Sequence, residues 1–243
     1  MLRHPTLAKL DELRLTGMAK AFEEQLQVSA PYAEMSFEER LGLLVDREAL
    51  ERTNRRLEYR LRRAKLRQVA SVEDLDFRHP RGLDKRLMRS LIECRWIAEH
   101  HNLLLTGPTG TGKTYIACAL AHKACREGYT ALYARCSTLL RELELARADG
   151  RYGKLLDRMA KTDLLLLDDW GLVPLGEPQR RDLYEILEDR SGLRSTIVTS
   201  QYPVESWHEL LGEPTLADAI LDRLIHGASR IALTGESMRK GAP

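Results

Sequence analysis

The segment that decides the fold reads Gly107-Pro108-Thr109-Gly110-Thr111-Gly112-Lys113-Thr114. It fits the phosphate-binding pattern G-x-x-x-x-G-K-[ST], which requires a strand before it and a helix after it. The sequence predicts both, because the apolar run of residues 102–106 precedes the segment and the helical stretch of residues 115–121 follows it. An ordinary glycine-rich turn is the alternative, but the adjacent Lys113 and Thr114 favour a phosphate-binding loop.

The chemistry of this loop predicts a nucleoside triphosphate as its ligand. Glycines allow successive backbone amides to point at phosphate oxygens, and the start of the following helix adds partial positive charge. Lys113 is expected to neutralise the β- and γ-phosphates of ATP, and the Thr114 hydroxyl is expected to bind Mg²⁺. The predicted ATP-binding residues are Gly107, Pro108, Thr109, Gly110, Thr111, Gly112, Lys113 and Thr114.

The pattern around the loop predicts the fold class. Short apolar runs alternate with helical stretches from residue 102 onward, which is typical of a parallel sheet with helices on both faces. The predicted fold is therefore an α/β domain with a five-stranded parallel sheet. Its expected strands are residues 102–106, 130–134, 163–168, 195–200 and 230–234.

A second motif, which is acidic, follows the loop, with Asp168 fifty-four positions after Thr114. The run Leu164–Leu167 leads directly into Asp168 and Asp169, so a buried strand is expected to end in two carboxylates. This arrangement resembles a Walker B element, in which Asp168 would hold Mg²⁺ and Asp169 would polarise the attacking water. The alternative is a core strand that happens to end in two solvated acids.

Two further candidates stay open on the residues alone. Ser200 or Gln201, at the end of the fourth run, could report the γ-phosphate by hydrogen bonding or could merely end a strand. Arg223 lies on an amphipathic helix of residues 216–224, where it could be either a catalytic cation or a surface ion-pair residue.

The first 70 residues have a different pattern, with apolar residues three and four apart and no alternating stretch, so this region is expected to be helical. Ser36 and Glu39 form a predicted capping box that opens a helix. Residues 70–76 lose the helical pattern. We therefore expect a small all-helical N-terminal domain, residues 1–70, for DNA or partner binding, and an ATPase domain, residues 71–243.

Basic charge gathers at the end of the helical region. The segment Arg52–Arg67 holds eight basic side chains and one Glu, a net charge of +7. Five of its arginines recur at spacings of four, four, three and four, which predicts one face of a helix. We expect this face to bind the DNA backbone with little sequence preference, and a solvated helix face is the alternative. The predicted DNA-binding residues are Arg52, Arg55, Arg56, Arg60, Arg63 and Arg67.

Composition limits the cellular setting. The chain has 243 residues with 38 basic and 36 acidic side chains, so any basic partner surface is local. Four cysteines without zinc-ligand spacing indicate reduced core thiols. The N-terminus has no signal-peptide pattern, and no apolar run could span a membrane. We expect a cytoplasmic protein without membrane contact.

These motifs together resemble the IstB family of transposition helper ATPases of insertion sequences. The resemblance includes the phosphate-binding loop and the segments 164–171, 199–204, 214–224 and 235–240, in order along nearly the whole chain. That family belongs to the AAA+ ATPases and is similar to DnaC-type helicase loaders. The resemblance implies that Arg223 is an arginine finger acting on a neighbour's ATP, that Ser200-Gln201 is sensor 1, and that Arg239 is a sensor 2 candidate. One departure is the second acid of Walker B, which is Asp169 here instead of the usual Glu.

The functional prediction combines both lines of reasoning. The resemblance implies an ATPase that oligomerises on double-stranded DNA in an ATP-dependent way, hydrolyses ATP to ADP and phosphate, and assists the transposase of the same element in target selection. A DnaC-like replicative helicase loader is the nearest alternative. A small-molecule kinase would need a lid rich in arginine, which the sequence after Asp169 does not show. A structural DNA-binding protein that merely binds ATP is a third alternative, which Asp168 and Asp169 argue against.

Overall fold

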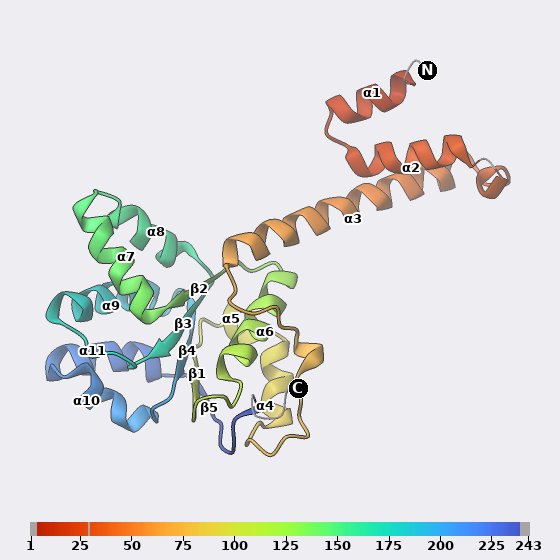
Figure 1. Cartoon of the computed structure of the whole chain (residues 1–243). Helices are drawn as coiled ribbons and strands as arrows, with labels where there is room; N and C mark the ends of the chain where they lie inside the picture. Colours follow the sequence, from red (N-terminus) through yellow and green to blue (C-terminus); the bar gives the residue numbers. More distant parts are fainter. Residues whose placement is uncertain (1–3, 29, 239–243) are drawn as a thin grey trace. The chain divides into compact units, whose positions relative to one another are not determined.

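The computed structural model describes residues 4–28 and 30–238 of the chain (Figure 1). Two compact units divide it, Met1–Tyr59 and Arg60–Pro243, and each is described by itself. The helices are α1 (Pro5–Glu12), α2 (Thr16–Gln27), α3 (Phe37–Ala64), α4 (Lys85–Ile92), α5 (Arg95–Ala98), α6 (Lys113–Arg126), α7 (Cys136–Ala148), α8 (Tyr152–Lys161), α9 (Glu177–Arg190), α10 (Trp207–Leu211) and α11 (Pro214–Ile225). The strands are β1 (Leu103–Thr106), β2 (Ala131–Arg135), β3 (Leu164–Trp170), β4 (Ser195–Ser200) and β5 (Ser229–Ala232), and short 3₁₀ helices occupy η1 (Ala30–Tyr32), η2 (Val72–Asp74) and η3 (Val204–Ser206).

The larger unit contains a five-stranded sheet in the order β2-β3-β4-β1-β5, in which every neighbouring pair is parallel. The predicted α/β fold and its five strands are therefore confirmed. The strand β3 extends to Trp170, two residues beyond the prediction, and its pairing with β4 shifts register between Leu167 and Trp170. This irregularity contains both acidic residues of the predicted Walker B element.

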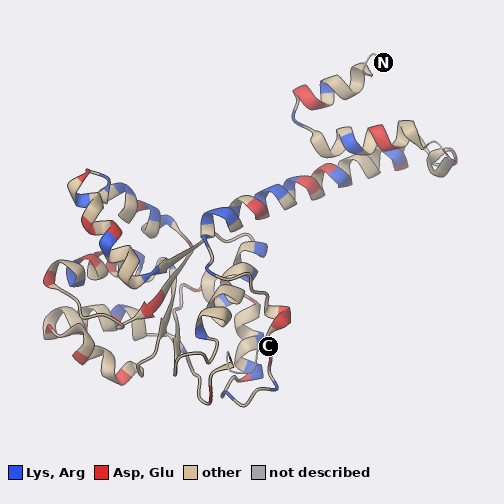
Figure 2. Cartoon of the chain, in the orientation of Figure 1, with Lys and Arg blue, Asp and Glu red and all other residues tan. Residues whose placement is uncertain are grey.

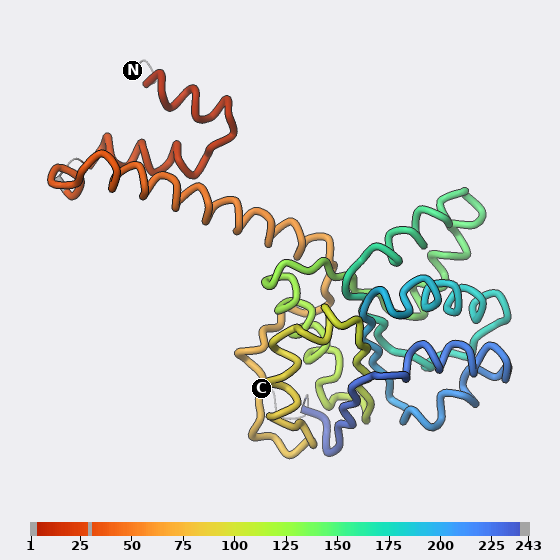
Figure 3. The backbone as a smooth tube through the Cα atoms, turned by 180° about the vertical axis from the view of Figure 1, so that it is seen from behind, coloured from red at the N-terminus to blue at the C-terminus, as the bar shows by residue number. Residues whose placement is uncertain are grey.

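Helices cover both faces of the sheet, with α4, α5 and α6 on one face and α7 to α11 on the other (Figures 1 and 3). Parallel strands covered on both faces are built from continuous apolar runs, and β1, β3 and β4 are buried along almost their whole length. Alternate strand residues such as Leu104, Leu165 and Val198 pack into the core under α7 to α11. The two predicted nucleotide motifs lie at the carboxyl ends of β1 and β3.

The smaller unit contains α1, α2 and most of α3. The predicted capping box is confirmed, because the Glu39 carboxylate accepts from the Ser36 amide at 2.7 Å and the Ser36 hydroxyl accepts from the Glu39 amide at 3.2 Å. Gly17 lies inside α2, where a Cβ atom would stand 2.6 Å from the Cα of Glu48 on α3. Glycine therefore permits the close approach of α2 and α3.

The helix α3 ends at Ala64, earlier than the arginine spacing predicts. Lys65 adopts a φ of +50°, a left-handed conformation of the kind that ends helices, and turns the chain away from the helix axis. Arg67 therefore lies beyond the helix, and its predicted place on the basic helix face is wrong.

Two expectations from composition concern the remaining structure. All four cysteines are buried and free, and burial raises the pKa of the Cys94 and Cys125 thiols to about 11. Within residues 4–28 and 30–238, no helix is long and apolar enough to cross a membrane.

Candidate nucleotide site

The phosphate-binding segment forms a tight loop between β1 and α6. Gly107 and Gly112 both have positive φ angles, +139° and +92°, which glycine adopts without the penalty of a side chain. A Cβ atom on Gly107 would collide with the Leu233 carbonyl, and one on Gly112 would collide with the Arg81 guanidinium. The glycines are therefore required by backbone conformation and by close packing against two other segments.

Lys113, the first residue of α6, turns its side chain back into this loop. Its Nζ donates to the Gly107 carbonyl at 2.6 Å and to the Pro108 carbonyl at 2.8 Å, and only 8 % of the residue is exposed. Backbone oxygens thus hold the ammonium beside the loop, where it can face a bound phosphate.

Asp168 is fully buried at the centre of a hydroxyl network. Its Oδ1 accepts from Thr114 at 2.8 Å and from Thr199 at 2.5 Å, and its Oδ2 accepts from the Tyr133 hydroxyl at 2.7 Å. The structure brings together Thr114 and Asp168, the two residues predicted to hold Mg²⁺. Burial and the hydrogen bond to Asp168 raise the pKa of Tyr133, so its hydroxyl stays a donor.

Asp169 is partly exposed and adopts a φ of +61°, a left-handed conformation that aspartate tolerates better than most residues. Its amide donates to Thr199 at 3.2 Å, and its carboxylate accepts from the Arg135 Nε at 2.8 Å. The irregular end of β3 therefore separates the two acids, with Asp168 pointing into the network and Asp169 reaching the neighbouring cavity.

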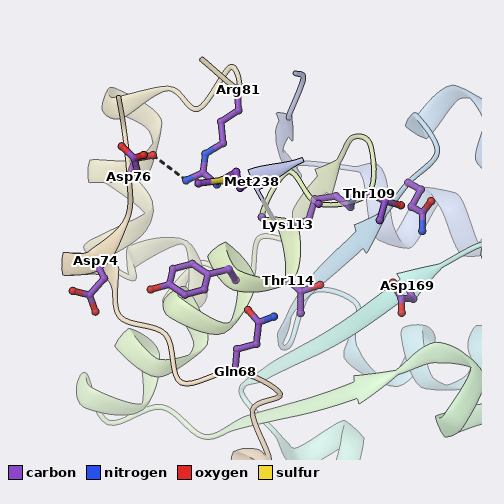
Figure 4. A pocket seen from close by; sticks show the side chains of 13 residues that line it. Gln68, Asp74, Asp76, Arg81, Thr109, Lys113, Thr114, Asp169 and Met238 are labelled. Carbon is purple, nitrogen blue, oxygen red and sulfur yellow. Dashed lines mark hydrogen bonds between the residues drawn. The ribbon is translucent and has the colours of Figure 1, made fainter. Parts of the chain in front are cut away.

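That cavity, of about 360 Å³, lies beside the loop (Figure 4). Lys113 and Thr114 lie at its centre, Asp169 lies on one side, and Asp76 and Arg81 lie on the opposite side. Its lining residues are Gln68, Asp74, Asp76, Arg81, Thr109, Gly110, Gly112, Lys113, Thr114, Tyr115, Asp169, Gln201 and Met238.

Sequence reasoning missed the side of the cavity formed by the connector before α4. Arg81 is 2 % exposed there, and its guanidinium donates to the Thr111 carbonyl at 3.0 Å and to the Asp76 carbonyl at 2.9 Å. Burial lowers the pKa of Arg81. Met238 packs on the same guanidinium, and its amide donates to the Gly110 carbonyl at 3.0 Å. This connector carries no motif, so its place in the site follows only from tertiary packing.

The two sensor 1 candidates lie in different environments. The buried Ser200 hydroxyl donates to the Trp170 carbonyl at 2.9 Å and accepts from the Tyr202 amide at 3.1 Å. Gln201 is exposed and lines the cavity. The geometry therefore favours Gln201 over Ser200 as the residue that faces a bound nucleotide.

Arg223 lies on α11, outside the residues that line the cavity. Its guanidinium pairs with Glu188, donates to the Ala219 carbonyl at 2.8 Å, and lies 5.0 Å from the centre of the Tyr184 ring. Within its own chain, Arg223 is thus an ion-pair residue on the face of the unit formed by α9 and α11. Arg239, the sensor 2 candidate, lies outside the described residues.

Basic residues recur along α3, where they are blue in Figure 2. The arginines of the basic segment have diverse partners. Arg52 donates to Glu48 at 2.8 Å, and Arg55 donates to the Thr16 hydroxyl at 2.6 Å. Arg60 donates to the Cys125 carbonyl at 2.9 Å, and Arg67 lies 3.5 Å from Asp168. Arg56 and Arg63 are exposed.

The donor set fits magnesium with a triphosphate. Thr114 and Asp168 offer only hydroxyl and carboxylate oxygens, the hard ligands that Mg²⁺ prefers. Residues 4–28 and 30–238 contain no cluster of three or more His, Cys, Asp or Glu that could hold a metal alone. Mg²⁺ commonly binds through one or two carboxylates together with phosphates and water, so this sparse set is the expected kind.

The parallel sheet and the loop that joins β1 to α6 define a P-loop ATP-binding protein of the AAA+ class. The family model for IstB-like ATP binding proteins matches residues 8–242. The insertion sequence ATP-binding protein y4pL of Sinorhizobium fredii is 55 % identical over 240 residues, which cover 99 % of this chain and 98 % of that protein. The ATP-binding protein of insertion sequence IS21 from Pseudomonas aeruginosa is 30 % identical, over 97 % of this chain and 89 % of that protein. The chain therefore belongs to the IstB-like ATP-binding proteins of insertion sequences.

Solved structures agree with this class. DnaI matches with a TM-score of 0.57 and 26 % identity, over 68 % of this chain and 92 % of that chain. The DnaC helicase loader matches with a TM-score of 0.55 and 22 % identity, over 65 % of this chain and 94 % of that chain. The resemblance to the helicase-loader fold is confirmed.

Proposed function

We propose that this protein is a Mg²⁺-dependent ATPase that assembles on double-stranded DNA and assists the transposase of its own insertion sequence in target selection. The observation that carries the catalytic part is the meeting of Lys113, Thr114, Asp168 and Asp169 beside one cavity. Family membership supports the insertion-sequence context. Mg²⁺, when bound, would neutralise charge on the transferring phosphoryl group.

The residues of this chain divide the work at the cavity. Loop amides and Lys113 bind the phosphates, and Thr114 with Asp168 supplies oxygen ligands for the metal. Asp169, at the cavity edge, orients the attacking water and accepts its proton. Gln201 hydrogen-bonds at the γ-phosphate end of the cavity.

Arg223 completes the site of a neighbouring copy in this proposal. It lies on α11, away from the cavity of its own chain, and has a partner in Glu188 that a neighbouring phosphate would have to replace. A guanidinium suits that exchange, because it binds carboxylate and phosphate with the same fork of donors. Self-association into an ATP-dependent oligomer follows from this role.

The proposed DNA surface is the exposed part of the basic segment, within a helical N-terminal domain of residues 1–70. Arg56 and Arg63 are exposed, and the Arg52 side chain is 53 % exposed despite its bond to Glu48. Arginines spaced along a helix bind phosphates without reading bases, so little sequence preference is expected.

A titration with a fluorescent ATP analogue tests the site. Lys113→Ala should weaken binding by about 10- to 100-fold, because it removes a charge-assisted hydrogen bond to the phosphates. Lys161→Ala is the matched control, since Lys161 is exposed on α8 and pairs with Asp157. Equal affinity of Lys113→Ala and the parent would refute the site.

Partner capture separates the proposal from a DnaC-like helicase loader, which shares the fold. The tagged protein should retain the transposase encoded by its own element in the presence of ATP and DNA. Retention of the replicative helicase in place of the transposase would favour the loader.

A further inference from the structure

Arg67 is the one member of the predicted DNA-binding set that reaches the nucleotide site. The chain turns at Lys65, and the Arg67 guanidinium then lies 3.5 Å from the Asp168 Oδ2 and 3.9 Å from the Asp169 Oδ2. Its side chain is 46 % exposed, whereas that of Asp168 is fully buried. A hydrogen bond with Tyr133 and the two carboxylates raise the pKa of Arg67, so it stays cationic.

The surroundings of Asp168 explain why a cation lies there. Three hydroxyl groups donate to this carboxylate, but hydroxyls carry no net charge. A buried carboxylate needs a counter-charge, and Arg67 supplies one at Oδ2. Arg135 has the same relation to Asp169, at 2.8 Å.

Magnesium would compete with this arrangement. A dication beside Thr114 and Asp168 repels a guanidinium held 3.5 Å from the same carboxylate. Arg67 can withdraw because almost half of its side chain already faces solvent. It follows Ala64, the last residue of α3, by only three positions.

We propose that Arg67 is a resident counter-ion of Asp168 and Asp169, which Mg²⁺ displaces when nucleotide binds, and that this exchange couples the nucleotide site to the end of the basic helix. The inference rests on the proposed metal site. It makes Arg67 a positioning residue, with a role different from that of the other arginines in its segment.

Hydrogen bonds hold the end of α3 on the larger unit, close to the site of this exchange. Arg60 donates to the Cys125 carbonyl at the end of α6, the helix that begins with Lys113. Arg158 of α8 donates to the Arg63 carbonyl at 3.3 Å. The hydrogen bonds at Arg60 and Arg63 hold one end of the segment between Ala64 and Arg67 on the larger unit, and the ion pair of Arg67 holds the other end on the same unit. Displacing Arg67 therefore changes the charge next to the end of α3.

A Mg²⁺ titration of the full-length protein with a non-hydrolysable fluorescent ATP analogue tests the inference. Arg67→Gln should lower the apparent dissociation constant for Mg²⁺ by about two- to fivefold, since it removes the competing cation of a half-exposed ion pair. Arg67→Lys should keep the parent value because it keeps the charge. Arg89→Gln, an exposed change on α4, should have no effect.

Thermal unfolding provides a readout independent of binding. Arg67→Gln should lower the melting temperature in EDTA without nucleotide, where Asp168 loses its counter-charge. The loss should shrink when Mg²⁺ and the analogue are present, because the metal then replaces the guanidinium. An equal loss in both conditions would show a purely structural role and overturn the inference.

Four other results are decisive. An unchanged or weaker Mg²⁺ affinity in Arg67→Gln, or an Arg67→Lys protein that behaves like Arg67→Gln, would overturn the counter-ion role. Weaker binding of the analogue to Arg67→Gln in EDTA would overturn it as well, because Arg67 would then contact phosphate directly. Nucleotide binding that is independent of Mg²⁺ in the parent would instead refute the proposed metal site itself.

Discussion

The phosphate-binding loop and the basic segment are both recognisable in the sequence, but their residues are arranged differently in the structure. The loop keeps its residues together, with Lys113 and Thr114 at the centre of one cavity. The basic segment distributes its arginines among different partners, from Glu48 in the smaller unit to Asp168 in the larger.

The difference is physical. Positive φ angles at its glycines and the start of a helix determine the conformation of the loop locally. A run of charges fixes no backbone conformation. Each long arginine side chain pairs with whatever acceptor the tertiary structure presents.

The largest expected effect is on ATP hydrolysis and concerns Arg223. Arg223→Ala should retain ATP binding but lose hydrolysis by about 10³- to 10⁵-fold, the range for arginine fingers in other NTPases. Steady-state phosphate release at saturating ATP and DNA measures it. Glu188→Gln is the matched control, because it breaks the same ion pair while keeping Arg223.

Mixing proteins tests whether Arg223 acts between subunits. Arg223→Ala combined with Asp169→Asn should recover some hydrolysis, since a mixed interface can pair an intact Asp169 with an intact Arg223. If Arg223→Ala and Glu188→Gln behave alike, Arg223 is only an ion-pair residue.

A smaller effect, on stability, is expected at Glu48, the carboxylate that accepts a hydrogen bond from Arg52. Glu48 accepts from the Gly17 amide at 2.7 Å and the Met18 amide at 3.2 Å at the start of α2. Glu48→Ala should lower the stability of this helix pair by about 1–3 kcal/mol, because buried amides lose their acceptor. Hydrogen exchange of those amides in the whole protein reports it.

The pH dependence of the same change sharpens this prediction. Burial alone would raise the pKa of Glu48, but Arg52 and the Met18 and Gly17 amides lower it below its ordinary value. The stability that Glu48 contributes is therefore present above the unfolded pKa, near pH 4.5, and is lost as pH falls through the lower folded value. The difference in hydrogen-exchange protection between the parent and Glu48→Ala should become smaller below that pH. A difference that stays constant with pH would contradict the stabilising role of the ionised Glu48 carboxylate.

The smallest expected effect concerns the exposed arginines. Arg56→Ala combined with Arg63→Ala should reduce the slope of log affinity for double-stranded DNA against log salt by about 1.8, the value for two phosphate contacts. Arg89→Ala with Arg181→Ala removes the same charge elsewhere and should leave the slope unchanged. Equal slopes for the parent and the Arg56–Arg63 double variant would place the DNA on another surface.

The sequence was sufficient for the elements that local rules determine. Short apolar runs predicted the strands, and the Ser36–Glu39 spacing predicted a helix start, because burial and capping act within a few residues. The sequence also placed Thr114 and Asp168 in one site, since the carboxyl ends of all strands in a parallel sheet lie at the same edge.

Long-range packing accounts for what the sequence did not predict. Arg81 comes from a segment without a motif, and Met238 comes from a segment to which the sequence assigned no role at the cavity; both reach the cavity only in the folded unit. Tyr133 and Thr199 bind Asp168 from two different strands. The end of α3 at Ala64 moved Arg67 from the expected helix face to the nucleotide site, and one turn at Lys65 was sufficient to do so.

The most direct test of the proposed function measures ATP binding and ATP hydrolysis on one preparation of Asp169→Asn. We propose that the cavity beside Gly107–Thr114 is a hydrolytic site in which Asp169 activates water. Asp169→Asn should bind ATP and Mg²⁺ as the parent does and should hydrolyse ATP about 10²- to 10⁴-fold more slowly. Asp157→Asn, an exposed change on α8, should match the parent in both measurements. Parent-like hydrolysis by Asp169→Asn would contradict this role of Asp169.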